Sequence, residues 1–107
     1  MEKQKEQELY KLEIKKPVEY DGVTYTSLEF DFDALTGDDA LNIDEELASL
    51  GKSAPVAAFS TEYLIRMAAK ACTSPIGADF FRKLSIVQFE QIKNKARSFL
   101  LSAGSET

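Results

Sequence analysis

The feature that most constrains the fold is a pair of alternating stretches joined at Asp21-Gly22. In the first stretch, Tyr10, Leu12 and Ile14 alternate with charged residues, which is the period of a strand with one buried face. The Asp-Gly pair tolerates the positive φ angles that a tight turn requires. We therefore expect residues 9–33 to form a two-stranded antiparallel hairpin.

The second stretch changes the side of its apolar residues partway along. Val23 and Tyr25 occupy odd positions, whereas the apolar residues from Leu28 onward occupy even ones. Either a bulge near Thr26-Ser27 rotates the strand, or both of its faces are partly covered. Pro17, in the first strand, has no N–H to donate, so it should end the pairing or lie at its edge.

Helical patterns follow the hairpin. Thr36 before several acids predicts a helix start, and Gly51 predicts its end. Ser60 or Thr61 opens a second helix that should end near Cys72, and a short helical turn follows over 78–84.

A capping box of Ser85 and Gln88 opens the closing helix. The inward face of this helix is predicted to contain Ile86, Phe89, Ile92, Ala96, Phe99 and Leu100.

These elements predict a single α+β domain spanning residues 1–107. The N-terminal two-stranded antiparallel hairpin is followed by three or four helices packed as one layer, over residues 36–101. Residues 1–8 are expected to be frayed, and residues 102–107 to form a polar tail.

Composition argues against catalysis and cofactors. The chain has no histidine and a single cysteine, Cys72, which we interpret as a small buried apolar residue. It has no glycine-rich phosphate loop and no paired-cysteine metal motif. A calcium loop starting at Asp31 fails because Leu35, Thr36 and Asn42 stand where ligands or glycine are required. We therefore expect no enzyme activity, no cofactor and no metal.

Charge is segregated along the chain, whose net charge is −5. Residues 28–51 contain eight acids and no base, whereas residues 52–107 contain eight bases and four acids. So acidic a chain is not expected to bind nucleic acid. No apolar run is long enough to cross a bilayer, and the first residues do not resemble a secretory signal, so a cytosolic protein is expected.

The apolar helical stripes have two interpretations. Most of their residues should form the core, but three or four helices on a two-stranded hairpin leave little depth, so some should remain for a partner. The predicted partner-binding surface is the exposed share of Leu47, Leu50, Phe59, Tyr63 and Phe81.

Taken together, the hairpin and helices resemble the phage tail assembly chaperone family of Mu-type and P2-type tailed phages and prophages. The hairpin contributes Leu12, Pro17-Val18, Asp21-Gly22, Tyr25, Leu28 and Phe30 to the likeness. The helical half contributes Tyr63-Leu64-Ile65, Ala68, Pro75-Ile76-Gly77, Leu84 and Phe99-Leu100. The aspartate expected soon after Leu84 is missing, although Ser85 can cap the helix in its place.

The resemblance implies a non-enzymatic protein of the host cytoplasm that is absent from the finished virion. Such proteins are thought to coat the tape measure protein and keep it soluble until tail tube subunits polymerise around it. A frameshifted long form often recruits those subunits, and homo-oligomers are expected. Two alternatives remain open: a structural subunit whose hairpin edge adds a strand to a neighbour, and a small acidic regulator that docks on a basic surface.

Overall fold

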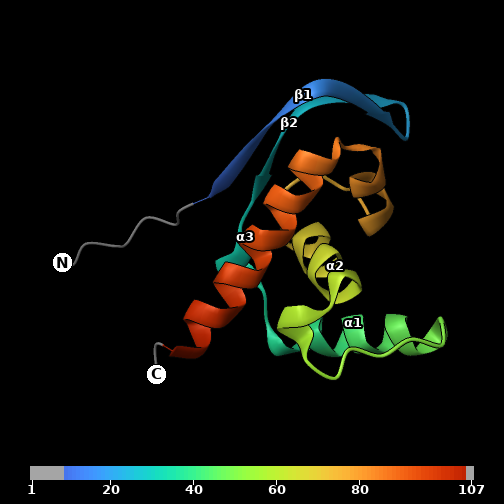
Figure 1. Ribbon diagram of the computed structural model, residues 1–107. Helices are drawn as coiled ribbons and strands as arrows, with labels where there is room; N and C mark the ends of the chain where they lie inside the picture. Colours follow the sequence, from blue (N-terminus) through green and yellow to red (C-terminus); the bar gives the residue numbers. More distant parts are fainter. Residues whose placement is uncertain (1–8, 106–107) are drawn as a thin grey trace.

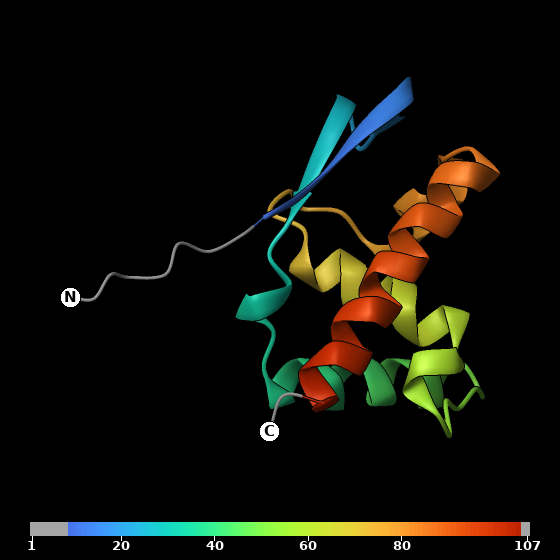
Figure 2. The ribbon, with the colours of Figure 1, turned by 60° about the vertical axis from the view of Figure 1, so that its left-hand side comes forward.

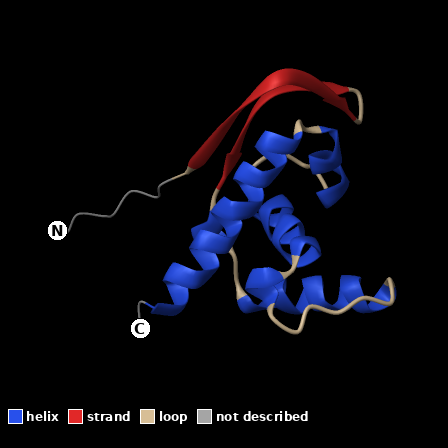
Figure 3. Ribbon diagram, viewed as in Figure 1, coloured by secondary structure: helices blue, strands red, loops and turns tan. Residues whose placement is uncertain are grey.

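The computed structural model describes residues 9–105, and it has the expected α+β architecture of a hairpin followed by helices (Figures 1 and 3). The hairpin consists of β1 (Tyr10–Tyr20) and β2 (Val23–Phe30). The α-helices are α1 (Gly37–Ser49), α2 (Thr61–Ala71) and α3 (Ile86–Ser105). Short 3-10 helices lie between them: η1 (Phe32–Ala34), η2 (Ala57–Phe59) and η3 (Ala78–Lys83). The expectation for residues 1–8 lies outside the described residues.

The hairpin turns where the sequence predicts it. Asp21 and Gly22 have φ angles of 54° and 81°, as a two-residue type I′ turn requires. Pairing runs from Tyr20↔Val23 to Tyr10↔Phe30, with one irregularity between Glu13 and Val18. The two strands are therefore paired on both sides of the irregularity.

The irregularity explains the change in apolar parity. Glu13 pairs with Ser27 and Val18 pairs with Tyr25, so residues 14–17 of β1 lie opposite Thr26 alone. The predicted bulge near Thr26-Ser27 is therefore confirmed in place, but the extra residues belong to the first strand. Pro17 lies inside this unpaired stretch, where its missing N–H costs no ladder bond.

Gln88 at the start of α3 bonds β1 where the unpaired stretch begins. Its Oε1 accepts a hydrogen bond from the Lys15 N–H at 3.1 Å, and its Nε2 donates to the Glu13 carbonyl at 2.5 Å. The backbone half of the predicted capping box is present, because the Gln88 N–H donates to Ser85 Oγ at 3.2 Å. The other half is wrong, since the Gln88 side chain reaches the hairpin instead of the Ser85 backbone.

The second strand is attached to the helical part along its outer edge. The Thr73 N–H donates to the Glu29 carbonyl at 2.9 Å, and the Asp31 N–H donates to the Ala71 carbonyl at 2.8 Å. At the far end of the hairpin, the Tyr20 hydroxyl donates to Asp79 Oδ1 at 2.8 Å. The hairpin is thus fixed to the segment after α2 and to the start of η3.

The predicted caps of α1 and α2 are present. A capping box joins Thr36 and Asp39 at the start of α1. At its end Gly51 has φ +73°, the left-handed conformation of a Schellman motif. Ser60 Oγ accepts from the Tyr63 N–H at 3.1 Å and so caps α2. These ends were predictable because each is set by residues close in sequence.

The last helix differs from its prediction at both ends. It continues to Ser105, so most of the expected polar tail is helical. At its start, Ile86 is 76% exposed instead of inward. Counting back from buried Ile92, Ile86 lies about 120° around the helix from the inward face, because successive residues turn by about 100°.

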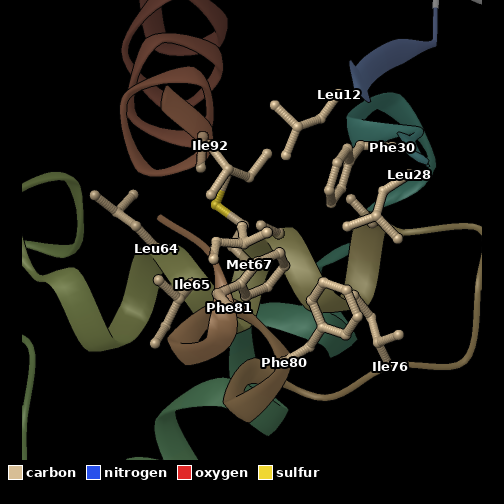
Figure 4. Packing of buried hydrophobic residues seen from close by; sticks show 14 of the residues in the cluster. Leu12, Leu28, Phe30, Leu64, Ile65, Met67, Ile76, Phe80, Phe81 and Ile92 are labelled. Carbon is tan, nitrogen blue, oxygen red and sulfur yellow. The ribbon is translucent and has the colours of Figure 1, made fainter. Parts of the chain in front are cut away.

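One hydrophobic core joins the hairpin to all three α-helices (Figure 4). Leu12 and Phe30 enter it from the hairpin, Met67 from α2 and Ile92 from α3. The helix α2 packs against both α1 and α3. The hairpin and α1 lie at opposite ends of the molecule in both ribbon views (Figures 1 and 2).

Candidate partner-binding surface

Three of the five predicted contact residues belong to the core. Leu47, Tyr63 and Phe81 are 1%, 8% and 0% exposed, so the prediction that they offer a surface is wrong. Leu47 lies on the inward face of α1 with Ile43. Phe81 packs against Phe30, with ring centroids 6.2 Å apart. A domain this thin uses nearly all of its periodic apolar residues internally.

The other two predicted residues are exposed but lie on different segments. Leu50 caps the C-terminal end of α1 and is 55% exposed, whereas Phe59 ends η2 and is 72% exposed. Figure 1 shows the chain running back along α1 between these two points. The five residues therefore do not form one surface, and Phe59 is the most exposed of them.

The turn that presents Phe59 is held from both sides. The Ala58 carbonyl accepts a hydrogen bond from Arg97 Nε of α3 at 2.8 Å, and Ala58 itself is buried. Directly after Phe59, Ser60 caps α2. These bonds fix the backbone on both sides of Phe59, whose ring is exposed.

Apolar side chains flank this contact. Val56, before η2, is 54% exposed. Leu101 follows Arg97 by one turn on the same face of α3 and is 53% exposed. We call Val56, Phe59 and Leu101 the η2–α3 surface. An exposed aromatic ring beside an arginine is the composition typical of the centre of a protein–protein interface.

Sequence reasoning missed several of these exposed residues. Val56 and Leu101 were not singled out, and neither were Leu41 and Val87, which are 61% and 62% exposed. For Ile86 and Val87 a signal exists: counted back from Ile92 at about 100° per residue, both lie more than about 90° from the inward face of the helix, so the helical period turns the two aliphatic side chains outward. No such signal exists for Val56, because it lies in a loop without a period.

A hollow between α1, α2 and the start of η3 is lined by charges that compensate each other. Lys70 Nζ lies 3.2 Å from Glu46, and Arg66 Nε lies 3.6 Å from the same carboxylate. Arg66 also bonds Glu62, and this hydrogen bond is the main reason that the pKa of Glu62 is lowered. Since each cation has a carboxylate partner, the hollow is poorly suited to an anionic ligand.

Two further reactive groups, Cys72 and Tyr63, are packed against or within the hydrophobic core. Burial raises the pKa of the Cys72 thiol, and burial also raises the pKa of Tyr63. Within residues 9–105, no group of three or more acidic, cysteine or histidine side chains is placed to hold a metal ion. None of the helices in this same part of the chain is both long and apolar enough to cross a membrane.

In comparisons with known proteins, no family model, no curated protein and no solved structure matches this chain.

Proposed function

We propose that this chain is a non-enzymatic phage or prophage tail assembly chaperone. It binds the tape measure protein in the host cytoplasm and keeps it soluble while the tail tube assembles. Several copies bind one client, with contacts between the copies. The observation that carries this proposal is Phe59, a 72% exposed ring on a turn fixed by Arg97 and by the cap of α2.

The η2–α3 surface suits an amphipathic helical client. Helix-in-groove recognition buries apolar anchors at helical spacing, and an exposed ring on a fixed backbone supplies one such anchor without ordering the chain around it. Truncating a central aromatic anchor typically costs 2 kcal/mol or more of binding free energy, which is a factor of about 30 in affinity. Phe59 is therefore the residue on which the proposal depends most.

The residues of the family resemblance support the proposal through their roles in the fold. Asp21-Gly22 makes the hairpin turn, and Tyr25 packs edge-on against Phe80 at 5.5 Å. The Gly77 N–H, in the break after α2, donates to the Tyr20 hydroxyl at 3.1 Å. These residues join the hairpin to the helices. The likeness therefore concerns the architecture of the domain, and its residues do not include those of the η2–α3 surface.

Co-expression with the tape measure protein encoded beside this chain tests the proposal. The wild-type chain should keep the client in the soluble fraction, and Phe59→Ser should lose most of that effect. Ile86→Ser is the matched control, because Ile86 is as exposed as Phe59 but lies at the opposite end of α3. Loss of client solubility with both variants, or with neither, would contradict the role given to Phe59.

Two further observations separate this proposal from its alternatives. A chaperone should be missing from purified virions, whereas a permanent structural subunit should be found in them. If a frameshifted long form exists, its extension would follow α3, and that form alone should bind tail tube subunits.

A further inference from the structure

The hairpin has one covered edge and one open edge. Segment 71–73 covers the outer edge of β2 through the bonds at Glu29 and Asp31, and Phe30 forms a bridge with Cys72. The outer edge of β1 has no such segment among the described residues. Open edges of this kind are templates for an added strand.

The pairing register shows which groups of β1 face outward. Since the Glu29 carbonyl and the Asp31 N–H point away from β1, residues 28 and 30 point toward it. Their partners Leu12 and Tyr10 point back, so the backbone groups of Lys11 and Glu13 point to the open edge. The Gln88 bond to the Glu13 carbonyl agrees with this direction.

Gln88 marks where this open edge ends. Its side-chain amide bonds Glu13 and Lys15 much as a neighbouring strand would, and it is 4% exposed. An added strand therefore has the edge from Leu9 to Glu13 available, and its path beyond Glu13 is blocked by the start of α3.

A groove of about 580 Å³ runs beside this edge, with α3 as its other wall. Polar side chains of α3 line it, among them Gln91, Asn94 and Ser98. Its charged lining residues are three lysines and one glutamate: Lys11, Lys15, Lys95 and Glu13. Lys11 Nζ pairs with Glu13 at 3.4 Å, so Lys15 and Lys95 supply the excess positive charge. The groove is thus basic in a chain of net charge −5.

We propose that the open edge of β1 takes up an extended acidic segment of a partner protein as an added strand. The outward backbone groups of Lys11 supply strand pairing, and the lysines supply charge complementarity. This site goes beyond the proposed chaperone function, because its ligand is extended and acidic, whereas the client of the η2–α3 surface is helical and apolar.

A displayed library of random linear ten-residue peptides, selected on the whole chain, tests the inference. Enriched peptides should be acidic and rich in β-branched residues. Lys11→Pro should weaken their binding by about tenfold or more, because proline removes the outward N–H. Glu19→Pro is the matched control: Glu19 also faces outward on β1, since the flanking pairs at Val18 and Tyr20 face β2, but it lies beyond Gln88.

Thermal unfolding of both variants provides the fold control. If both variants unfold at the same temperature and only Lys11→Pro loses binding, the added strand is supported. N-methylation of alternate peptide residues should then abolish binding too. Selected peptides that bind Lys11→Pro with the same affinity as the wild-type chain would overturn it. The lysines would then serve only to prevent aggregation through the open edge. A selection without acidic peptides, together with a wild-type chain that dimerises and a Lys11→Pro variant that does not, would overturn it. The open edge would then pair with a second copy of this chain. None of these outcomes depends on client solubility, so this inference and the chaperone proposal fail independently.

Discussion

At the scale of single residues, Gln88 joins the two halves of the molecule. It lies 73 and 75 positions from the groups that it bonds in β1. A local pattern could therefore predict its backbone cap on Ser85 but not the destination of its side chain. Its amide satisfies backbone groups of β1 that have no partner in β2.

Replacing Gln88 by alanine should lower the free energy of unfolding by about 1–3 kcal/mol, because it leaves the Glu13 carbonyl and the Lys15 N–H unpaired. Gln91→Ala is the matched control, since Gln91 is exposed on the same helix. Urea unfolding measures both. Equal stability of the two variants would contradict the role given to Gln88.

Cys72 provides a pH-dependent test at the same scale. Burial raises the pKa of its thiol, so the folded chain favours the protonated form. This contribution to stability is complete below the ordinary thiol pKa and is lost as pH rises through the raised folded value. At pH 8, a disulfide reagent should modify Cys72 at least about tenfold more slowly in the folded chain than in urea. Equal rates would show that the thiol is not protected.

At the scale of elements, local chemistry makes the helix ends predictable. Gly37 begins α1 and Gly51 follows its C-cap, and an added Cβ would meet no atom within 4 Å at either position. They differ in backbone conformation, because only Gly51 has a positive φ. Any difference between alanine substitutions at the two sites therefore reports conformational preference and not packing.

Gly51→Ala should destabilise the chain by about 1 kcal/mol, because the left-handed conformation is costly for alanine. Gly37→Ala should be neutral or should stabilise by a few tenths of a kcal/mol. The difference between the two unfolding midpoints in urea checks this. A more stable Gly51→Ala variant would contradict the Schellman end of α1.

Elements whose boundaries depend on distant contacts were less predictable. The hairpin turn and the caps of α1 and α2 follow from adjacent residues, and the structure has them. Which strand contains the bulge, and where the Gln88 side chain points, depend on how α3 lies against β1. For the same reason, the sequence could place Leu47, Tyr63 and Phe81 on helices but could not separate core from surface.

At the scale of the whole molecule, the acids of α1 and the η2–α3 surface lie at the same end, opposite the hairpin (Figure 1). The two differ in character, because the η2–α3 surface has apolar side chains around Arg97. If the client binds the η2–α3 surface, raising the salt from 50 to 500 mM should change its affinity less than about threefold. A steep loss of affinity with salt would instead favour an acidic regulator that docks through α1.

In the proposed function, several copies of this chain bind one tape measure protein and keep it soluble. Light scattering on the purified co-expressed complex measures this stoichiometry, because the mass gives the number of copies per client. We expect one client with several copies of the 107-residue chain. A clean monomer of this chain, with the tape measure protein left in the insoluble fraction, would contradict it.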